Sequence, residues 1–373
     1  MKINYRLTIL SFLIIMFSSC NQTNKITPDD SDILLNNWMV YLHDSTRICK
    51  LSIPGTHDAL TGCGFTNSEY INDYTTQVAN FDQQLIGGLR YFDIRLILAG
   101  DTANRYLVTS HRTASITLSF DDVLMKAKQF LCDNPSEFLI LKIQYDGGTM
   151  SDDDHTAWNS LIQSKINGDS YKQLFVDFRP DIRVKDMRGK ILLISRTSYG
   201  TPVCGALTNW MDEGTDDYVK MDSIAERTLV LSPTPEAAVA YNGGDHPYAA
   251  RLYVQDFYNS IGSRMTSKLN ALDAMFRSAI EIPSSQNIWV LNHTSGFSTP
   301  KMNAIGYAEN ASKTNSRLLY LLEHDTTHAP IGIIAMDFAC IDTLNQNIGT
   351  LGNINRQVMS KSLTYAIIKR NFK

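Results

Sequence analysis

The sequence has few cysteines, and no two of them have the Cys-x-x-Cys spacing. Its six cysteines are widely scattered over 373 residues, which argues against both a zinc site and a disulfide scaffold. Apart from Cys20, they are Cys49, Cys63, Cys132, Cys204 and Cys340. We predict that these five are free, buried thiols, with one disulfide as the alternative in an oxidising compartment.

The sequence also lacks an excess of charge of either sign. It contains 34 basic and 38 acidic residues, and the formal net charge is -4. No overall positive field attracts the protein to nucleic acid or to an anionic membrane. We therefore expect no nucleic-acid partner, and any contact with lipid must be local.

The apolar run near the amino terminus, from Leu7 to Phe17, is too short to span a membrane as a permanent helix. Lys2 and Arg6 precede it, and small residues lead from it to Cys20, as in a lipoprotein signal peptide. This pattern predicts a signal over residues 1–19 and an exported protein anchored in the cell envelope by a lipid on Cys20. The alternative is a secreted protein that has a cysteine there by chance.

The rest of the chain is predicted to form a tether and one domain. Residues 20–37 are polar and are typical of a tether, whereas residues 38–373 have no second linker. The stretch 200–247 is rich in Gly, Pro, Asp and Thr, which indicates a long insertion in the domain.

Short apolar runs alternate with longer amphipathic segments along this domain. The eight candidate strands are Ile48–Ile53, Leu89–Leu96, Tyr106–Ser110, Phe138–Ile143, Lys190–Ser195, Leu252–Gln255, Ile288–Leu291 and Ile331–Met336. Two intervening segments, Phe120–Asp133 and Arg264–Ile280, have helical periodicity, and Ser119 is placed to cap the first. The alternation predicts an α/β fold, a distorted TIM-type (β/α)8 barrel.

Polar residues gather at or just after the ends of these candidate strands, where a barrel of this type places its chemistry. They are His57, Asp58, Asp93, Arg95, His111, Gln144, Arg196, Asp256, Tyr258 and Asp337. Because the ends of parallel strands converge, we expect these side chains to meet in one mouth.

Two histidines in this set are suited to acid–base chemistry. His57 follows a strand and a Pro-Gly turn, with Asp58 beside it, although a surface histidine in a turn would give the same pattern. His111 ends a later strand. Displacement at a phosphodiester needs one base and one acid, and histidine suits both roles near neutral pH.

Asp93 and Arg95 lie two residues apart on a strand and therefore point to the same face. Buried opposite charges must be paired, so the two residues are compatible with a structural ion pair inside the barrel. A fixed guanidinium is also well shaped to hold a phosphate oxygen. The sequence leaves both alternatives open.

Read together, the motifs from about Trp38 to Asn371 resemble the bacterial phosphatidylinositol-specific phospholipase C family. The motifs are Ile53-Pro54-Gly55-Thr56-His57-Asp58, Gly88-Leu89-Arg90-Tyr91-Phe92-Asp93-Ile94-Arg95, Phe130-Leu131-Cys132-Asp133-Asn134-Pro135-Ser136-Glu137, Arg188-Gly189-Lys190-Ile191, Val254-Gln255-Asp256-Phe257-Tyr258 and Ile334-Ala335-Met336-Asp337. Their order along the chain is the order of the family.

The resemblance implies a metal-independent cleavage of an inositol phospholipid to diacylglycerol and a cyclic inositol phosphate. His57 is then the general base for the inositol 2-hydroxyl, supported by Asp337. His111 is the general acid, supported by Asp58. Arg95, held by Asp93, stabilises charge on the phosphate in place of a calcium ion, so we expect no cofactor and activity in chelator.

The headgroup is expected to lie against residues that the resemblance assigns to inositol binding, namely Arg196, Asp256, Tyr258 and Gln144. Gln144 departs from the family, where a lysine is expected, and Lys142 lies two residues earlier. Arg112 also departs, because a glycine is expected after His111.

The expected partner is phosphatidylinositol or a glycosylphosphatidylinositol-type lipid at a membrane surface, bound by a monomer. A glycerophosphodiester phosphodiesterase is one alternative, because Ser110-His111-Arg112 is similar to that family's histidine–arginine turn. The expected metal-binding Glu-x-Asp is absent from the second strand, which argues against it. Another alternative is a catalytically silent surface lipoprotein that binds inositol lipids or glycans.

Overall fold

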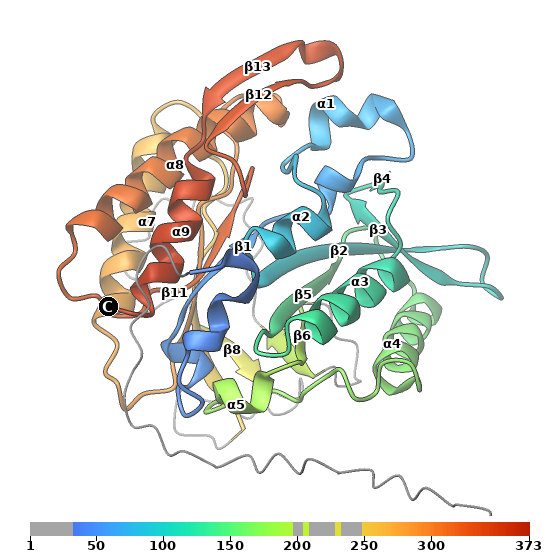
Figure 1. Cartoon of the computed structure of the whole chain (residues 1–373). Helices are drawn as coiled ribbons and strands as arrows, with labels where there is room; N and C mark the ends of the chain where they lie inside the picture. The colour runs from blue at the N-terminus through green and yellow to red at the C-terminus, as the bar shows by residue number, and fades with distance from the viewer. Residues whose placement is uncertain (1–32, 197–203, 209–227, 233–247) are drawn as a thin grey trace, which may run out of the picture.

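The computed structural model describes residues 33–196, 204–208, 228–232 and 248–373 (Figure 1). Most of the described strands belong to one sheet, and β1 closes it by pairing with β11 on one side and with β2 on the other. The ring runs in the order β1, β2, β5, β6, β7, β8, β9, β10 and β11. The predicted barrel is therefore present in a distorted form.

Most strands of the ring are mutually parallel. They are β1 (Ser52–Thr56), β2 (Tyr91–Ala99), β5 (Leu139–Tyr145), β6 (Ile191–Ser195), β7 (Gly205–Thr208), β9 (Ala250–Gln255), β10 (Trp289–His293) and β11 (Gly332–Met336). The pairing of β1 with β2 is short, Gly55 with Tyr91 and Thr56 with Phe92. A Cβ on Gly55 would come within 2.6 Å of the Tyr91 backbone oxygen, so glycine permits this closure.

The distortion arises in the stretch that the sequence indicated as an insertion. Two strands within residues 200–247, β7 (Gly205–Thr208) and β8 (Thr228–Ser232), complete the ring between β6 and β9. β8 is antiparallel to both of its neighbours. This part of the chain therefore contributes strands to the barrel itself. The two strands were not predicted because the stretch is rich in Gly, Pro, Asp and Thr.

Two strand predictions need correction. The strand predicted over Tyr106–Ser110 forms as β3 (Tyr106–His111), but it pairs antiparallel with β2 and lies outside the ring. β3 continues into the short β4 (Ala114–Ser115). The strand predicted over Ile48–Ile53 begins later, because Ile48–Lys50 forms a 3-10 helix, η2.

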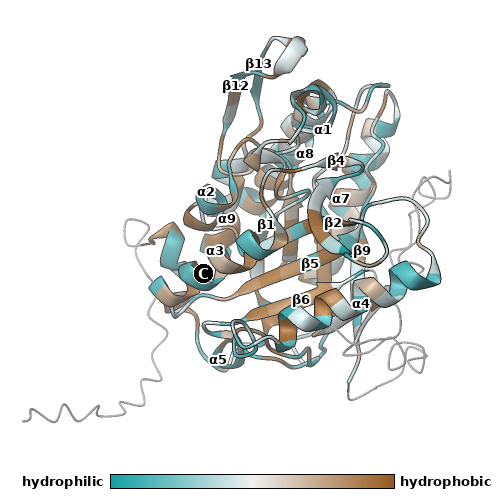
Figure 2. Cartoon of the chain, turned by 90° about the vertical axis from the view of Figure 1, so that its right-hand side faces the viewer, coloured by the Kyte–Doolittle hydropathy of each residue, from teal (hydrophilic) through white to brown (hydrophobic). Residues whose placement is uncertain are grey.

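Helices pack around the barrel, whose strands β5 and β6 are strongly hydrophobic (Figure 2). Those in the described part of the chain are α1 (Ile71–Tyr74), α2 (Phe81–Ile86), α3 (Phe120–Asp133), α4 (Asp152–Asn167), α5 (Val184–Met187), α7 (Arg264–Ile280), α8 (Ala304–His324) and α9 (Ser360–Arg370). The helices predicted over 120–133 and 264–280 are confirmed, and Ser119 caps α3 by accepting a hydrogen bond from the Asp122 N–H.

Shorter elements complete the description. Among the described residues, the 3-10 helices other than η2 are η1 (Leu35–Tyr41), η3 (Thr61–Cys63), η4 (Ser68–Tyr70) and η7 (Gly349–Leu351). A separate hairpin of β12 (Thr343–Asn347) and β13 (Asn353–Gln357) projects at one end of the molecule (Figure 1). Within the described residues, no helix has both the length and the apolar character needed to cross a membrane.

The folded part begins earlier than the predicted end of the tether at residue 37. Ile33 is buried, and η1 places Trp38 and Met39 in the core. Arg90 donates hydrogen bonds to the backbone oxygens of Leu35 and Asn36. The predicted signal peptide, Cys20 and most of the tether lie outside the described residues.

The cysteines agree only partly with the prediction. All five described cysteines are free, and Cys49 and Cys204 are buried. Cys63 and Cys340 are half-buried, whereas Cys132 is exposed on α3, which corrects the expectation that all five are buried.

Candidate active site

One cavity of ≈ 360 Å³ collects most of the residues selected from the sequence. Of the ten, it is lined by His57, Asp58, Arg95, His111, Gln144, Arg196, Asp256 and Tyr258. The other two, Asp93 and Asp337, are fully buried beside it and bond to Arg95 and His57. The strand ends therefore bring all ten side chains into one region.

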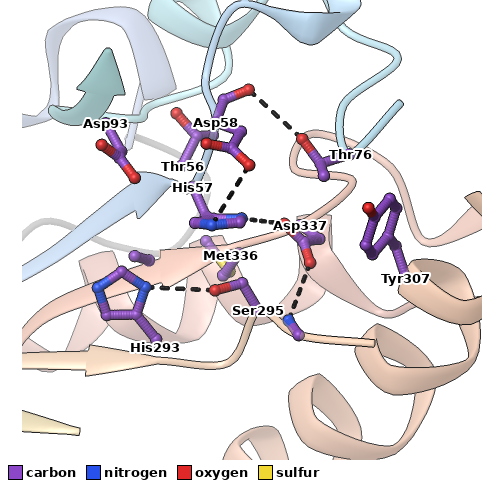
Figure 3. A network of polar contacts seen from close by, with 12 residues as sticks. Thr56, His57, Asp58, Thr76, Asp93, His293, Ser295, Tyr307, Met336 and Asp337 are labelled. Atoms are coloured by element: carbon purple, nitrogen blue, oxygen red, sulfur yellow. Dashed lines mark hydrogen bonds and ion pairs between the residues drawn. The ribbon is translucent and has the colours of Figure 1, made fainter. Parts of the chain in front are cut away.

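His57 follows β1 and is held from behind by a carboxylate. Its Nδ1 lies 2.9 Å from Asp337 Oδ1, at the end of β11 (Figure 3). The backbone N–H of Gly296 donates to the other oxygen of Asp337 at 3.2 Å, and Gln77 Nε2 donates to the His57 backbone oxygen at 2.8 Å. Since a carboxylate accepts, Nδ1 carries the proton, and Nε2 is the nitrogen that can take another.

Asp58 lies between the two histidines. Its Oδ2 is 3.4 Å from His57 Nε2 and 3.1 Å from His111 Nε2, and its Oδ1 is 3.2 Å from Arg95 Nε. The Asp58 backbone has φ 41°, a left-handed conformation that aspartate tolerates better than most residues. A single buried carboxylate thus bridges two imidazoles at the edge of the cavity.

His111, at the end of β3, faces a hydrogen-bond acceptor on each side. Its Nδ1 lies 2.8 Å from the backbone oxygen of Tyr74, and its Nε2 faces Asp58. A carbonyl oxygen and a carboxylate can only accept, so both ring nitrogens of His111 face acceptors. The Tyr74 ring packs edge-on against His111, with 5.2 Å between centroids.

Charges around His57 outweigh the effect of burial. Burial disfavours the imidazolium, but the carboxylates of Asp58 and Asp337 raise the pKa of His57 to about 9. Burial raises the pKa of Asp337. For Asp58, burial is opposed by His111, His57 and Arg95, which together lower its pKa.

Arg95 is fixed by a bidentate contact with Asp93. Its Nε donates to Asp93 Oδ1 at 3.0 Å and its Nη2 donates to Oδ2 at 2.9 Å, while Nη1 donates to Asp146 Oδ1 at 3.3 Å. Lys142, also buried, donates to Asp93 Oδ1 at 2.9 Å. Burial lowers the pKa of Lys142 to about 8, although Asp93 favours the charged form. Asp93 therefore anchors two cations at the floor of the cavity.

Gln144 joins these cations to the side of the cavity assigned to the headgroup. Its Oε1 accepts from Lys142 Nζ and from Arg196 Nη1, each at 3.1 Å. Asp256 Oδ1 lies 3.8 Å from the Nδ1 of the buried His293, and the Tyr258 ring packs against Phe297. An arginine, a carboxylate, an amide and an aromatic face thus surround the space, which suits a polyhydroxylated ring.

The donor atoms of His57, Asp58 and Asp93 lie within 4.8 Å of one another, close enough to hold a metal ion. Three such ligands are few for calcium, which takes about six to eight. The Arg95 Nε also lies 3.0 Å from Asp93 Oδ1 and 3.2 Å from Asp58 Oδ1. Both carboxylates thus already face a cation, and the donor set fits a resident divalent ion poorly.

Some residues of the site were missed in the sequence. His293 ends β10, and the rule used for the other strands would have found it if the strand had not been predicted to stop at Leu291. Asp146 lies just after β5 and lines the cavity. Tyr307 lines it from α8, and no signal in the sequence indicated that a helix residue reaches the mouth.

The fold and the site together define a class: a distorted (β/α)8 barrel with a paired-histidine acid–base site and a fixed arginine at its mouth.

No family model matches the chain. Among curated proteins, it is similar to the 1-phosphatidylinositol phosphodiesterase of Listeria monocytogenes, with 33% identity over 192 residues, 50% of this chain and 56% of the relative. It is also similar to the protein of the same name from Staphylococcus aureus, with 25% identity over 189 residues, 48% of this chain and 58% of the relative. The chain thus spans about half the length of the curated relatives it matches.

Solved structures extend the likeness over most of the chain. The phosphatidylinositol-specific phospholipase C of Listeria monocytogenes has a TM-score of 0.61 and 23% identity, covering 91% of this chain and 99% of that chain. A Staphylococcus aureus enzyme of the same name has a TM-score of 0.66 and 18% identity, covering 89% of this chain and 97% of that chain. The predicted fold class and the resemblance to bacterial phosphatidylinositol-specific phospholipases C are confirmed.

Proposed function

We propose that this protein is a phosphatidylinositol-specific phospholipase C. The observation that carries the proposal is the Asp58 carboxylate, which lies 3.4 Å from one imidazole and 3.1 Å from another at the edge of a single cavity. Two imidazoles held together in this way can bracket one phosphorus, one as base and one as acid.

In the proposed reaction, the substrate provides its own nucleophile. The oxygen of the inositol 2-hydroxyl forms a bond to phosphorus as its proton passes to His57 Nε2, while Asp337 stabilises the charged ring. The bond from phosphorus to the diacylglycerol oxygen breaks, and that oxygen takes a proton from His111 Nε2. The products are diacylglycerol and inositol 1,2-cyclic phosphate.

Arg95 supplies the positive charge for the phosphate oxygens. Of its five N–H groups, three have hydrogen-bond acceptors among the described residues, which leaves one on each terminal nitrogen. Asp93 holds the guanidinium in a fixed orientation, so little reorganisation is needed as charge develops. This arrangement supports turnover without a divalent ion.

The headgroup lies in this proposal against Arg196, Asp256, Tyr258 and Gln144, which line the same cavity as the two histidines. Substrates are phosphatidylinositol or a glycosylphosphatidylinositol-type lipid in a membrane. We further propose that the enzyme acts as a monomer and takes no nucleic-acid partner.

The proposal is tested by incubating the protein with vesicles of phosphatidylinositol or of phosphatidylcholine in a chelator. We expect diacylglycerol from the first lipid alone, at a rate that calcium does not increase. His57→Ala should abolish release while the protein remains folded and unfolds in one cooperative transition. Release from phosphatidylcholine alone, or release that requires calcium, would contradict the proposal.

We also propose that the protein is exported and held in the cell envelope by a lipid on Cys20. Support comes from the pattern of residues 1–20, a short basic start, an apolar run and small residues before the cysteine. Radiolabelled fatty acid should be incorporated into the wild type and not into Cys20→Ser. Equal labelling of both proteins, or none of either, would refute the anchor.

A further inference from the structure

The loop next to His111 has an unusual backbone for the residue it contains. β3 and β4 pair antiparallel, with His111 opposite Ala114, so Arg112 and Thr113 form a two-residue hairpin loop. Arg112, the first loop residue, has φ 52°. Two-residue hairpin loops place glycine, asparagine or aspartate at positions of positive φ, because a Cβ is strained there.

The side chain of Arg112 lies at the catalytic mouth. It lines the same cavity as His57, Arg95 and His111. Its Nη2 lies 2.9 Å from the Met302 sulfur, which is a weak acceptor. No carboxylate among the described residues forms an ion pair with its guanidinium, although the cavity wall contains Asp58, Asp146 and Asp256.

The hairpin itself does not depend on the arginine side chain. The backbone N–H of Arg112 donates to Asp146 Oδ2, and Asp146 Oδ1 accepts from Arg95 Nη1 at 3.3 Å. Every residue other than proline can supply that N–H. The turn would therefore be at least as stable with glycine, so the strain points to a use for the charge.

We propose that Arg112 is a substrate-binding residue that binds a phosphodiester oxygen of lipid on the leaving-group side of the cavity. This inference rests on the proposed function, because His111, the adjacent residue, is there the acid for the diacylglycerol oxygen. A guanidinium can hold such an oxygen by paired N–H donors. The oxygen belongs either to the scissile phosphate or to a neighbouring anionic lipid.

The test compares the full chain with Arg112→Gly, Arg112→Gln and Arg112→Lys, and with Arg277→Gln as a control. Arg277 is an exposed arginine on α7 that does not line the cavity. Each protein is assayed on monomeric short-chain phosphatidylinositol, and on phosphatidylinositol in phosphatidylcholine vesicles with and without phosphatidylglycerol. Unfolding midpoints are measured in parallel.

We expect Arg112→Gly and Arg112→Gln to lower kcat/KM about tenfold or more, as for loss of a hydrogen bond to a charged group. Arg112→Lys should retain most activity, and the control all of it. Arg112→Gly should match or exceed the wild-type unfolding midpoint, because glycine removes the strain. A loss on monomeric substrate places the arginine on the scissile phosphate. A loss confined to vesicles, and growing with phosphatidylglycerol, places it on neighbouring lipids.

Wild-type kcat/KM in Arg112→Gly on every substrate would overturn the inference, and so would a parallel loss of activity and stability. If the wild type releases no diacylglycerol, the proposed function is wrong. Lipid binding is then measured by sedimentation of both proteins with phosphatidylglycerol vesicles. Equal amounts of wild type and Arg112→Gly in the vesicle pellet would overturn the anion site as well.

Discussion

Two arginines, five residues apart along the chain, show how differently this protein uses the same side chain. Arg90 precedes β2 at the closed end of the barrel, and Arg95 points into the mouth. Arg90 pairs with Glu137 at 2.8 Å and 2.9 Å and also donates to four backbone oxygens, so each of its N–H groups has an acceptor. Arg95 faces the carboxylates of Asp93, Asp58 and Asp146. Among the described contacts, it donates no hydrogen bond to a backbone oxygen.

The pKa values of the two arginines are shifted in opposite directions. At the closed end, burial prevails, so it lowers the pKa of Arg90 and raises the pKa of Glu137. At the mouth, burial also opposes charge, but Asp93, Asp58 and Asp146 raise the pKa of Arg95 well above its usual value. Arg95 and Lys142 hold the pKa of Asp93 well below its usual value in turn.

The two arginines illustrate the difference between a purely structural ion pair and one whose arginine can still bind an anion. The Arg90–Glu137 pair has no exposed surface and ties η1 to the barrel through Met39 N–H and Glu137 Oε1 at 3.0 Å. Arg95 keeps 14% of its side-chain surface exposed, at a cavity that contains both candidate catalytic histidines. An arginine whose donors are all satisfied stabilises the fold, whereas one with donors remaining can bind an anion.

The largest expected effect comes from removing each arginine in turn. Arg95→Met should lower kcat about 10²- to 10³-fold, as for loss of a preorganised donor, while the unfolding free energy changes little because Lys142 still neutralises Asp93. Arg90→Met should instead lower the unfolding free energy by about 3–5 kcal/mol, because it leaves Glu137 buried without a partner. Its activity per folded molecule should remain near wild type. The measurements are kcat on phosphatidylinositol vesicles and chemical denaturation.

A smaller effect is expected when both members of each pair are replaced. Arg90→Met with Glu137→Gln should recover much of the stability lost by Arg90→Met alone, since no buried charge is left unpaired. Arg95→Met with Asp93→Asn should recover no activity. If the second pair of substitutions restored turnover, Arg95 would be only a structural partner of Asp93.

The pH dependence provides a finer distinction. With a His57 pKa of about 9, the neutral base is scarce at pH 7, so kcat/KM should rise with pH until about 9. Asp58→Asn removes a charge that raises this pKa, so the rising limb should move to lower pH by about one unit or more, with a lower maximum. Glu137→Gln should leave the pH at which kcat/KM rises unchanged. If Asp58→Asn also left that pH unchanged, the assignment of His57 as base would be contradicted.

The same raised pKa predicts the smallest effect, on stability. The folded protein binds a proton on His57 more tightly than the unfolded chain, whose histidine pKa is about 6.5. This contribution, at most about 3 kcal/mol, is fully present below pH 6.5 and is lost as the pH rises through 9. Denaturation of the wild type and of His57→Gln between pH 6 and pH 9.5 should converge as the pH rises.

The sequence indicated much of the site because strand ends in a barrel converge, so ten polar residues could be selected without knowing a distance. It did not reveal β7 and β8, because their short strands lie in a stretch dominated by Gly, Pro, Asp and Thr. It also placed β3 among the parallel strands, since the alternation of side chains is the same in an antiparallel hairpin.

The two arginines show the same limit at the level of single residues. Arg90 and Glu137 occur in motifs that were recognised, yet nothing in their spacing of 47 residues indicated that they pair. Asp93 and Arg95 could be paired in advance because strand periodicity puts them on one face. Local pairing is encoded by periodicity, whereas long-range pairing depends on which strands become neighbours.

The most direct test of the proposed mechanism is a crystal structure of the protein with inositol 1-phosphate bound. We predict one phosphate between the rings of His57 and His111, with Arg95 donating to its oxygens and the inositol 2-hydroxyl within hydrogen-bond distance of His57 Nε2. A phosphate bound elsewhere in the cavity, in contact with only one of the two imidazoles, would contradict it.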